Sequence, residues 1–177
     1  MLSGKEIVRQ RDIGNIVIEP FLESQVNPNS YNLTLGNELL IYTERVLDCA
    51  KHNKTRKIII PPEGIILLPD TLYLISTREY TETYGFVPQI SGRSSVGRVG
   101  LSVHTTAGLG ANGFKGRWTF TVSCTIPVQV FAGMQIGQIY YFPIEGDKTL
   151  IYNGGYQNNT GAVSSLLHGE MQNKKKE

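Results

Sequence analysis

The stretch Lys57-Ile-Ile-Ile-Pro-Pro-Glu-Gly-Ile-Ile-Leu-Leu-Pro-Asp-Thr-Leu-Tyr-Leu-Ile-Ser-Thr77 holds three short apolar runs divided by two turn signals. Pro61–Gly64 and Pro69–Asp70 carry residue types that favour tight turns. Short, β-branched apolar runs between such turns are typical of strands. This stretch therefore predicts consecutive short strands, as in a β-sandwich or barrel.

The same rhythm appears on both sides of this stretch. Downstream, Pro127 and Ala132–Gly133 divide three more apolar runs. Upstream, apolar and polar residues alternate in short segments, with Gly36 as a stop signal. The strands predicted in these regions are Asn15–Glu19, Tyr31–Leu35, Leu39–Tyr42, Val46–Leu47, Arg117–Thr125, Val128–Phe131 and Ile136–Phe142.

A single helix is predicted at the start of the chain. Ser3 and Glu6 have the spacing of a capping box, in which each side chain bonds a backbone N–H of the first turn. The helix should end near Arg11, and no later stretch keeps a helical period long enough for a βαβ unit. We therefore expect one all-β domain over residues 1–177.

Composition limits the partners and the location. The 177 residues carry a net charge of only +2, which does not suggest a nucleic-acid binder. Cys49 and Cys124 do not have the spacing of metal ligands, and two thiols are too few for a disulfide framework. The apolar runs are too short to span a bilayer. We expect a cytoplasmic protein with no membrane partner and no zinc site.

The loop Ser91–Leu101 is the candidate for anion binding. Two arginines, three serines and three glycines occupy its eleven positions, which offers donors and close backbone approach. No Asp or Glu occurs between Glu82 and Glu145, so the surrounding segment should hold a positive field. The alternative is a run of buried strands, which are also poor in acids.

The C-terminal segment from Tyr152 onward is rich in Gly and Asn and includes two tyrosines in Tyr152–Gly161. One interpretation is a flexible lid over residues 152–177 that orders over a ligand. The alternative is a frayed terminus.

Five segments together resemble the dCTP deaminase family of the dUTPase-like superfamily. They follow the family's order along the chain and cover nearly all of it. The segments are Asn27–Gly36, Arg93–Leu101, Val103–Ala107, Gly133–Gln138 and Tyr156–Gly161.

The resemblance implies a distorted jelly-roll β-barrel that forms a homotrimer, with sites at the subunit interfaces. Family members convert dCTP and water to dUTP and ammonia, and some also cleave dUTP to dUMP and pyrophosphate. The expected ligand is a deoxynucleoside triphosphate, namely dCTP, dUTP or dTTP, carried with Mg²⁺. The sequence has no P-C-x-x-C motif, which the zinc deaminases need.

The resemblance also assigns roles to matching positions. The phosphate loop would comprise Arg93, Ser94, Ser95, Val96, Gly97 and Arg98, and of these Ser94 and Arg98 would also approach the reacting base. The remaining substrate contacts would come from Thr106, Ala107, Ala111, Thr119, Phe120, Gln138, Tyr152, Tyr156 and Asn159. Among them, the backbone of Thr106 and Ala107 would hold the attacking water.

Three positions depart from the family pattern. The resemblance places the catalytic glutamate at Thr121 and an aspartate at Ala111, and it places a lysine at Gly155. A threonine hydroxyl cannot act as a base near neutral pH, so we expect deamination by the family mechanism to be impaired. His104 stands where the family has a supporting histidine rather than the base.

Several interpretations remain open at this point. The chain is a dCTP deaminase-family protein with impaired activity, an enzyme that has moved to another reaction, an altered form of an active deaminase, or an inactive nucleotide-binding or regulatory homologue. A jelly-roll scaffold without ligand is a further alternative, which the Arg93 to Arg98 constellation argues against.

Overall fold

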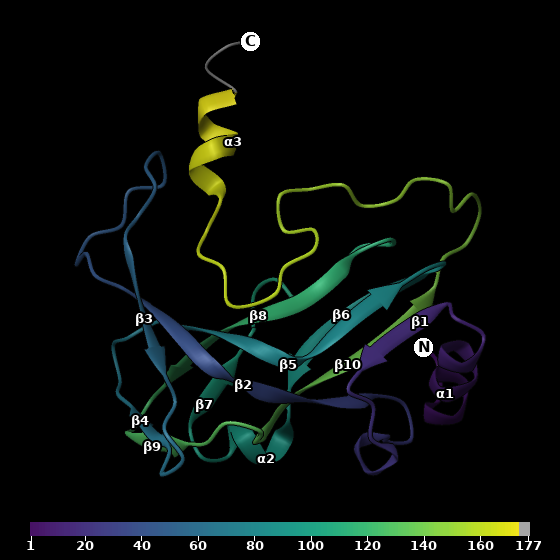
Figure 1. Cartoon of the computed structure of the whole chain (residues 1–177), viewed down its shortest axis with the longest axis horizontal. Coiled ribbons are helices and arrows are strands. Elements are labelled where there is room, and N and C mark those ends of the chain that lie inside the picture. The colour runs from purple at the N-terminus through teal and green to yellow at the C-terminus, as the bar shows by residue number, and fades with distance from the viewer. Residues whose placement is uncertain (174–177) are drawn as a thin grey trace.

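Ten β-strands make up most of the regular structure in residues 1–173, the part of the chain that the computed structural model describes (Figure 1). Three helices and one 3₁₀ turn complete this part. The strands are β1 Ile16–Glu19, β2 Tyr31–Tyr42, β3 Thr55–Ile59, β4 Ile65–Leu67, β5 Tyr73–Thr83, β6 Phe86–Gly92, β7 Leu101–Val103, β8 Lys115–Cys124, β9 Val128–Val130 and β10 Gln135–Pro143. The helices are α1 Gly4–Asp12, α2 Ser94–Gly97 and α3 Leu167–Asn173, and the 3₁₀ turn is η1 Glu23–Gln25.

Eight strands form one antiparallel sheet along the path β6-β10-β2-β5-β8-β7, with β1 added on β5 and β3 on β2. β4 and β9 pair separately. Register shifts interrupt the β2–β5, β5–β8 and β2–β10 pairs. Such irregularities bend strands, and the sheet wraps around the core as a nearly closed barrel. The predicted all-β barrel is therefore confirmed. Within residues 1–173, no helix combines the length and apolarity needed to cross a bilayer.

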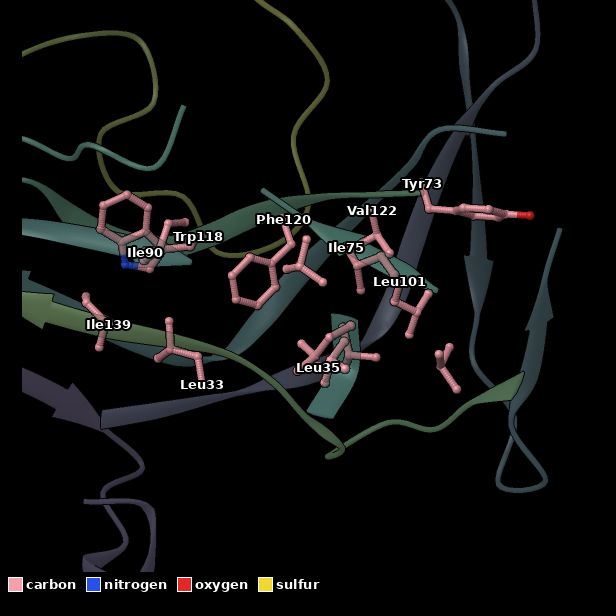
Figure 2. Packing of buried hydrophobic residues seen from close by; sticks show 14 of the residues in the cluster. Leu33, Leu35, Tyr73, Ile75, Ile90, Leu101, Trp118, Phe120, Val122 and Ile139 are labelled. Carbon is pink, nitrogen blue, oxygen red and sulfur yellow. The ribbon is translucent and has the colours of Figure 1, made fainter. Parts of the chain in front are cut away.

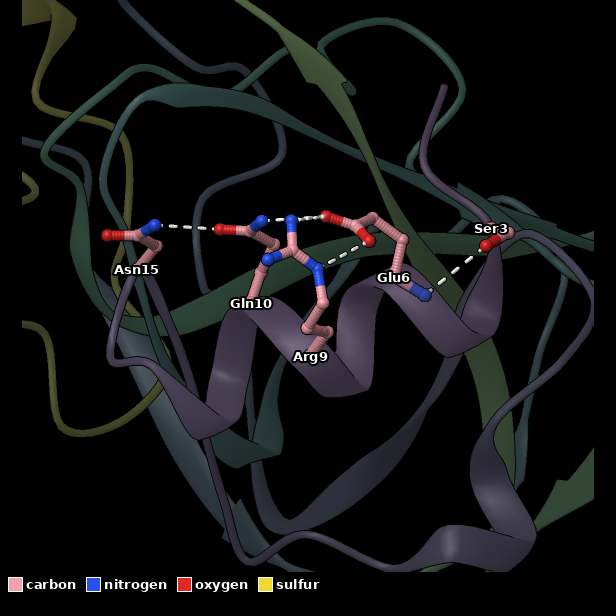
Figure 3. Close-up of polar contacts among 5 residues, drawn as sticks. All are labelled: Ser3, Glu6, Arg9, Gln10 and Asn15. Atoms are coloured by element: carbon pink, nitrogen blue, oxygen red, sulfur yellow. Dashed lines mark hydrogen bonds and ion pairs between the residues drawn. The ribbon is translucent and has the colours of Figure 1, made fainter.

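Helix α1 begins as predicted but is held differently. The Ser3 hydroxyl accepts the backbone N–H of Glu6 at 3.2 Å. The Glu6 carboxylate does not return to the cap; it accepts from Arg9 at 2.6 and 2.8 Å and from Gln10 at 2.7 Å (Figure 3). The reciprocal half of the predicted capping box is therefore wrong, because donors one turn along the helix bind the carboxylate instead. These bonds lower the pKa of Glu6 to about 2.

The predicted break at Gly36 is also wrong, because β2 runs through it. A Cβ at position 36 would lie 2.6 Å from the Ser76 hydroxyl and 2.9 Å from the Ser76 carbonyl oxygen. Glycine is therefore required for close strand approach rather than for a turn. Between Leu35 and Leu39 the pairing of β2 with β5 shifts register, which joins two predicted strands into one bent strand.

Two further differences concern loops. Val46–Leu47, predicted as a strand, lies in an exposed connection, and Val46 is 82% exposed. Short apolar pairs without a partner strand do not form a ladder. Helix α3 was not predicted, because Leu167–Asn173 lies in a segment with no core pattern.

The core is filled by alternate residues of the long strands (Figure 2). On β8, Trp118, Phe120 and Val122 point into the barrel, and Phe120 is completely buried. Phe120 also packs on Gly137 of β10, where an added Cβ would lie 2.5 Å from the ring. The aromatic side chain thus joins opposite walls of the barrel.

One carboxylate is buried inside the sheet. Glu79 on β5 is 1% exposed and accepts hydrogen bonds from the Thr34 backbone N–H at 2.9 Å, the Thr34 hydroxyl at 2.7 Å and the Gln25 amide at 3.1 Å. Buried charges persist only with such partners. Glu79 therefore ties η1 and β2 to β5 at the register shift.

We predict that Phe120→Ala lowers the free energy of unfolding by about 3–5 kcal/mol, because it removes a fully buried aromatic ring and leaves a cavity. Urea denaturation would measure the loss. Ser123→Ala, at an exposed position of the same strand, is the matched control and should change stability by less than about 0.5 kcal/mol. Equal stability of the two variants would contradict this packing role.

Candidate functional site

The arginine-rich loop follows directly from β6 and is anchored by a buried side chain and by hydrogen bonds to β10. Val96 is 2% exposed and fixes the single turn α2 to the core. Arg93 donates from its backbone to the Ile136 carbonyl at 3.3 Å and from Nη1 to the Gln135 carbonyl at 3.0 Å. Both partners lie on or beside β10, so the base of the loop is rigidly placed.

The exposed side of the loop carries the polar groups. Ser94, Ser95, Gly97 and Arg98 are exposed, whereas Val96 faces inward. In residues 1–173, neither Arg93 nor Arg98 pairs with a carboxylate. The loop therefore presents a charged guanidinium and two hydroxyls to solvent without an internal counterion, which suits an anionic ligand.

A cavity of about 590 Å³ lies against this loop, and we call it the loop cavity. Arg93, Gly97 and His104 contribute to its lining, together with the end of β6. Gln138 supports this region from behind: its Nε2 donates to the Gly92 carbonyl at 3.2 Å and its Oε1 accepts from the Ser30 hydroxyl at 2.9 Å. Gln138 thus braces the loop without lining the cavity.

A second cavity, of about 680 Å³, lies beneath the C-terminal segment, and we call it the tail cavity. It collects most of the remaining predicted site residues from three separate parts of the chain. These are Ala107, Ala111, Thr119, Thr121, Tyr152, Tyr156 and Asn159. Thr106 is exposed and lines neither cavity.

Strand β8 divides its residues between core and tail cavity. Arg117, Thr119 and Thr121 alternate with the buried residues and line the cavity. The Phe120 side chain, predicted to line a nucleoside pocket, lies in the core instead, because strand side chains alternate between faces. Any contact of Phe120 with a ligand is limited to its backbone. Cys124 is also buried on the core face, and burial raises the pKa of its thiol.

His104 lines both cavities and has both ring nitrogens engaged. Nδ1 accepts the backbone N–H of Thr121 at 3.4 Å, and Nε2 lies 2.7 Å from the Ala107 carbonyl oxygen. An acceptor at Nδ1 and a donor at Nε2 describe the neutral imidazole. Burial lowers the pKa of His104, which favours the same form. His104 therefore positions the Ala107 loop and is not free to act as a base.

The C-terminal segment crosses the open part of β8 (Figure 1). Asn159 forms a parallel bridge with Gly116, and the Arg117 backbone donates to the Asn159 carbonyl at 2.8 Å. Further along, the Val163 backbone donates to the Thr119 hydroxyl at 3.1 Å. The segment therefore covers the tail cavity of its own chain. Its flexibility stays a prediction, and residues 174–177 of the predicted lid lie outside the described part.

The sequence did not identify every residue of the tail cavity. Arg117 is recognisable in retrospect, since it shares the alternation of Thr119 and Thr121. Tyr42 and Val163 give no such signal, because they approach the cavity from distant parts of the chain. His104, which the sequence identified as a supporting histidine, is also in the lining. The other lining residues that were not predicted are Leu72, Leu74, Leu109, Gly110, Phe114, Trp118, Ser164 and Ser165.

We predict that His104 titrates below the ordinary histidine pKa of about 6.5 in an NMR titration. Above that pH the folded and unfolded chains are both neutral at this residue. As pH falls below it, the unfolded chain binds a proton first, so the free energy of unfolding should decrease until the native pKa is passed. His104→Asn, which tolerates the positive φ of 50° here, should reduce this decrease relative to the exposed control His52→Asn. A native pKa above 6.5 would contradict the prediction.

The chain is similar in sequence and fold to known proteins. A family model described as dCTP deaminase-like matches residues 1–144. A protein of Clostridium acetobutylicum named dCTP deaminase, dUMP-forming, is 53% identical over 174 residues, which are 98% of this chain and 99% of the relative. A protein of Leptospira biflexa with the same name is 47% identical over 174 residues, 98% of this chain and 99% of the relative.

The fold also has a solved counterpart. The crystal structure of 2'-deoxycytidine 5'-triphosphate deaminase from Agrobacterium tumefaciens superposes with a TM-score of 0.65 at 18% identity, covering 79% of this chain and 46% of that chain. At this identity the likeness concerns the fold alone. The family match and the near full-length relatives carry the assignment: the chain belongs to the dCTP deaminase-like family.

Proposed function

We propose that this chain binds a pyrimidine deoxynucleoside triphosphate. It deaminates dCTP more slowly than a variant that carries carboxylates at positions 111 and 121. One observation carries the proposal: the tail cavity gathers seven of the predicted site residues, yet within residues 1–173 no Asp or Glu lines it. Arg93, at the loop cavity, and the exposed Arg98 of the same loop offer guanidinium groups for phosphate oxygens.

The missing carboxylates bear on the chemistry. Deamination adds water to C4 of cytosine and releases ammonia, so a group must take a proton from water and deliver one to the leaving amine. Thr121 and Ala111 line the cavity but cannot exchange protons near neutral pH, and His104 has both nitrogens engaged. Loss of a positioned acid-base group typically costs about 10²- to 10⁴-fold in rate.

Mg²⁺ belongs to this proposal as part of the substrate. In residues 1–173, no group of three or more His, Cys, Asp or Glu side chains is arranged to hold a metal ion. The ion would be held by phosphate oxygens and water, which is how Mg²⁺ commonly accompanies nucleotides. The proposed location is the cytoplasm, where such nucleotides are made and used.

The proposal includes a homotrimer with sites between subunits. Among the described residues, the linings of the loop cavity and the tail cavity have only His104 in common. This separation suits a site in which one subunit contributes the loop cavity and another contributes the tail cavity. Beside the loop, Val99 and Ile126 are 46% and 58% exposed, which offers apolar surface for a neighbour.

We predict that the pure protein, incubated with dCTP and Mg²⁺, forms dUTP, dUMP and ammonia at least about 10²-fold more slowly than the double variant Thr121→Glu/Ala111→Asp. The restored carboxylates supply the missing proton transfer. Liquid chromatography of the nucleotides would follow the reaction.

Ser123→Glu, which places a carboxylate on the same strand outside the tail cavity, is the matched control and should not accelerate turnover. Turnover by the unmodified chain as fast as by the double variant would contradict the proposed slow deamination. Failure to bind dCTP, dUTP and dTTP in calorimetry would contradict the nucleotide site.

We predict a solution mass of three times the 19.6 kDa chain by light scattering. Val99→Asp should shift the mass toward one chain, because it places a charge in the proposed interface. Val46→Asp, in the exposed connection between β2 and β3, should leave the trimer intact. A monomer mass for the unmodified protein would contradict the assembly.

A further inference from the structure

The tail cavity is unusual in its hydrogen-bonding balance. Five of its lining hydroxyl groups already accept a backbone N–H at 3.0–3.3 Å, and each still has its proton to donate. In residues 1–173 none of these hydroxyls donates a hydrogen bond to protein. The five belong to Tyr42, Thr119, Tyr152, Tyr156 and Ser165.

The acceptor arrangement is fixed by the C-terminal segment. Ser165 donates to the Tyr42 hydroxyl at 3.1 Å, Leu166 to the Tyr156 hydroxyl at 3.0 Å, and Tyr156 to the Tyr152 hydroxyl at 3.3 Å, each from its backbone nitrogen. Since a hydroxyl has a single proton, each one that accepts here can still donate to a ligand.

Arg117 adds the single formal charge of the cavity lining. It lies on β8 between the buried Gly116 and Trp118, and it is partly buried. Within the described residues its guanidinium forms no hydrogen bond, ion pair or stacking contact with protein. A guanidinium offers five N–H donors, and a partly buried one is best satisfied by an acceptor on a ligand.

The cavity lacks a charged acceptor. Among the described residues no carboxylate lines it, and the Ala107 carbonyl already accepts from the neutral His104 ring. Phe114 and the tyrosines provide flat apolar walls that suit a ring. The cavity therefore favours a planar ligand whose edge carries carbonyl oxygens rather than amino groups.

We propose that the tail cavity selects 4-oxo pyrimidine nucleotides over 4-amino ones, with Arg117 as the specificity-determining residue. This inference rests on the proposed nucleotide site. A uracil or thymine ring presents the O4 acceptor, whereas cytosine presents the N4 amino donor. The cytosine amino group would find no charged acceptor in the described lining, whereas O4 would gain a charged donor.

Calorimetry with the α,β-imido analogues of dUTP and dCTP, in Mg²⁺, tests the selection, with chromatography after each titration to verify that the base is unchanged. The expected result is binding of the dUTP analogue about 10- to 100-fold tighter than the dCTP analogue. Arg117→Met, which keeps the aliphatic length and removes the donors, should bring the two affinities within about threefold. Arg56→Met, at an exposed position of β3, is the matched control and should keep the preference.

Two more measurements keep the test independent of folding defects. The ratio in the unmodified protein needs no variant, and Thr121→Glu, which adds an acceptor to the same cavity, should shift the preference toward the dCTP analogue. Equal or tighter binding of the dCTP analogue by the unmodified protein, or a preference retained in Arg117→Met, would overturn the inference while the nucleotide site stands. Binding of neither analogue would overturn the proposed function together with it.

Discussion

The alternation of side chains along β8 is the constraint on which both the core and the candidate site depend. Trp118, Phe120 and Val122 fill the barrel, while Arg117, Thr119 and Thr121 line the tail cavity from the other face. Side chains along a strand point alternately to two opposite faces, so a one-residue shift in the pairing register would exchange the two sets. Pairing with β5 and β7 prevents such a shift and thereby fixes the chemistry of the cavity.

The open part of β8 explains how the cavity is closed. β7 pairs only with residues 122–124, which leaves the backbone near Gly116 and Arg117 available. The C-terminal segment uses this edge, and its own N–H groups are satisfied by hydroxyls that line the cavity. Closure and polarity are therefore coupled: the bonds that hold the segment engage the cavity hydroxyls as acceptors and leave their protons for donation.

Different parts of the molecule match the pattern of the dCTP deaminase-like family to different degrees. The barrel, the arginine loop and the tyrosine-bearing segment agree with the resemblance seen in the sequence. The interior of the tail cavity carries Thr121, Ala111 and Arg117, and no carboxylate lines it among residues 1–173. The fold of the family is thus present, whereas the described lining of this cavity lacks a carboxylate that could move protons.

The sequence by itself determined the features that depend on neighbouring residues. Turn residues and apolar runs predicted the strands from Lys57 to Thr77, the Ser3 cap predicted the start of α1, and glycine, serine and arginine predicted the exposed loop. Each of these follows from local backbone preferences or side-chain period. The sequence also predicted seven of the residues that line the tail cavity, through the family resemblance.

Only the tertiary structure decided the features that depend on residues far apart in the chain. The passage of β2 through Gly36 follows from close approach to Ser76, and the neutral tautomer of His104 follows from its bonds to Thr121 and Ala107. The fold of the C-terminal segment depends on hydroxyls of Tyr42 and Thr119. Such partners meet only after the barrel closes, so no local pattern in the sequence records them.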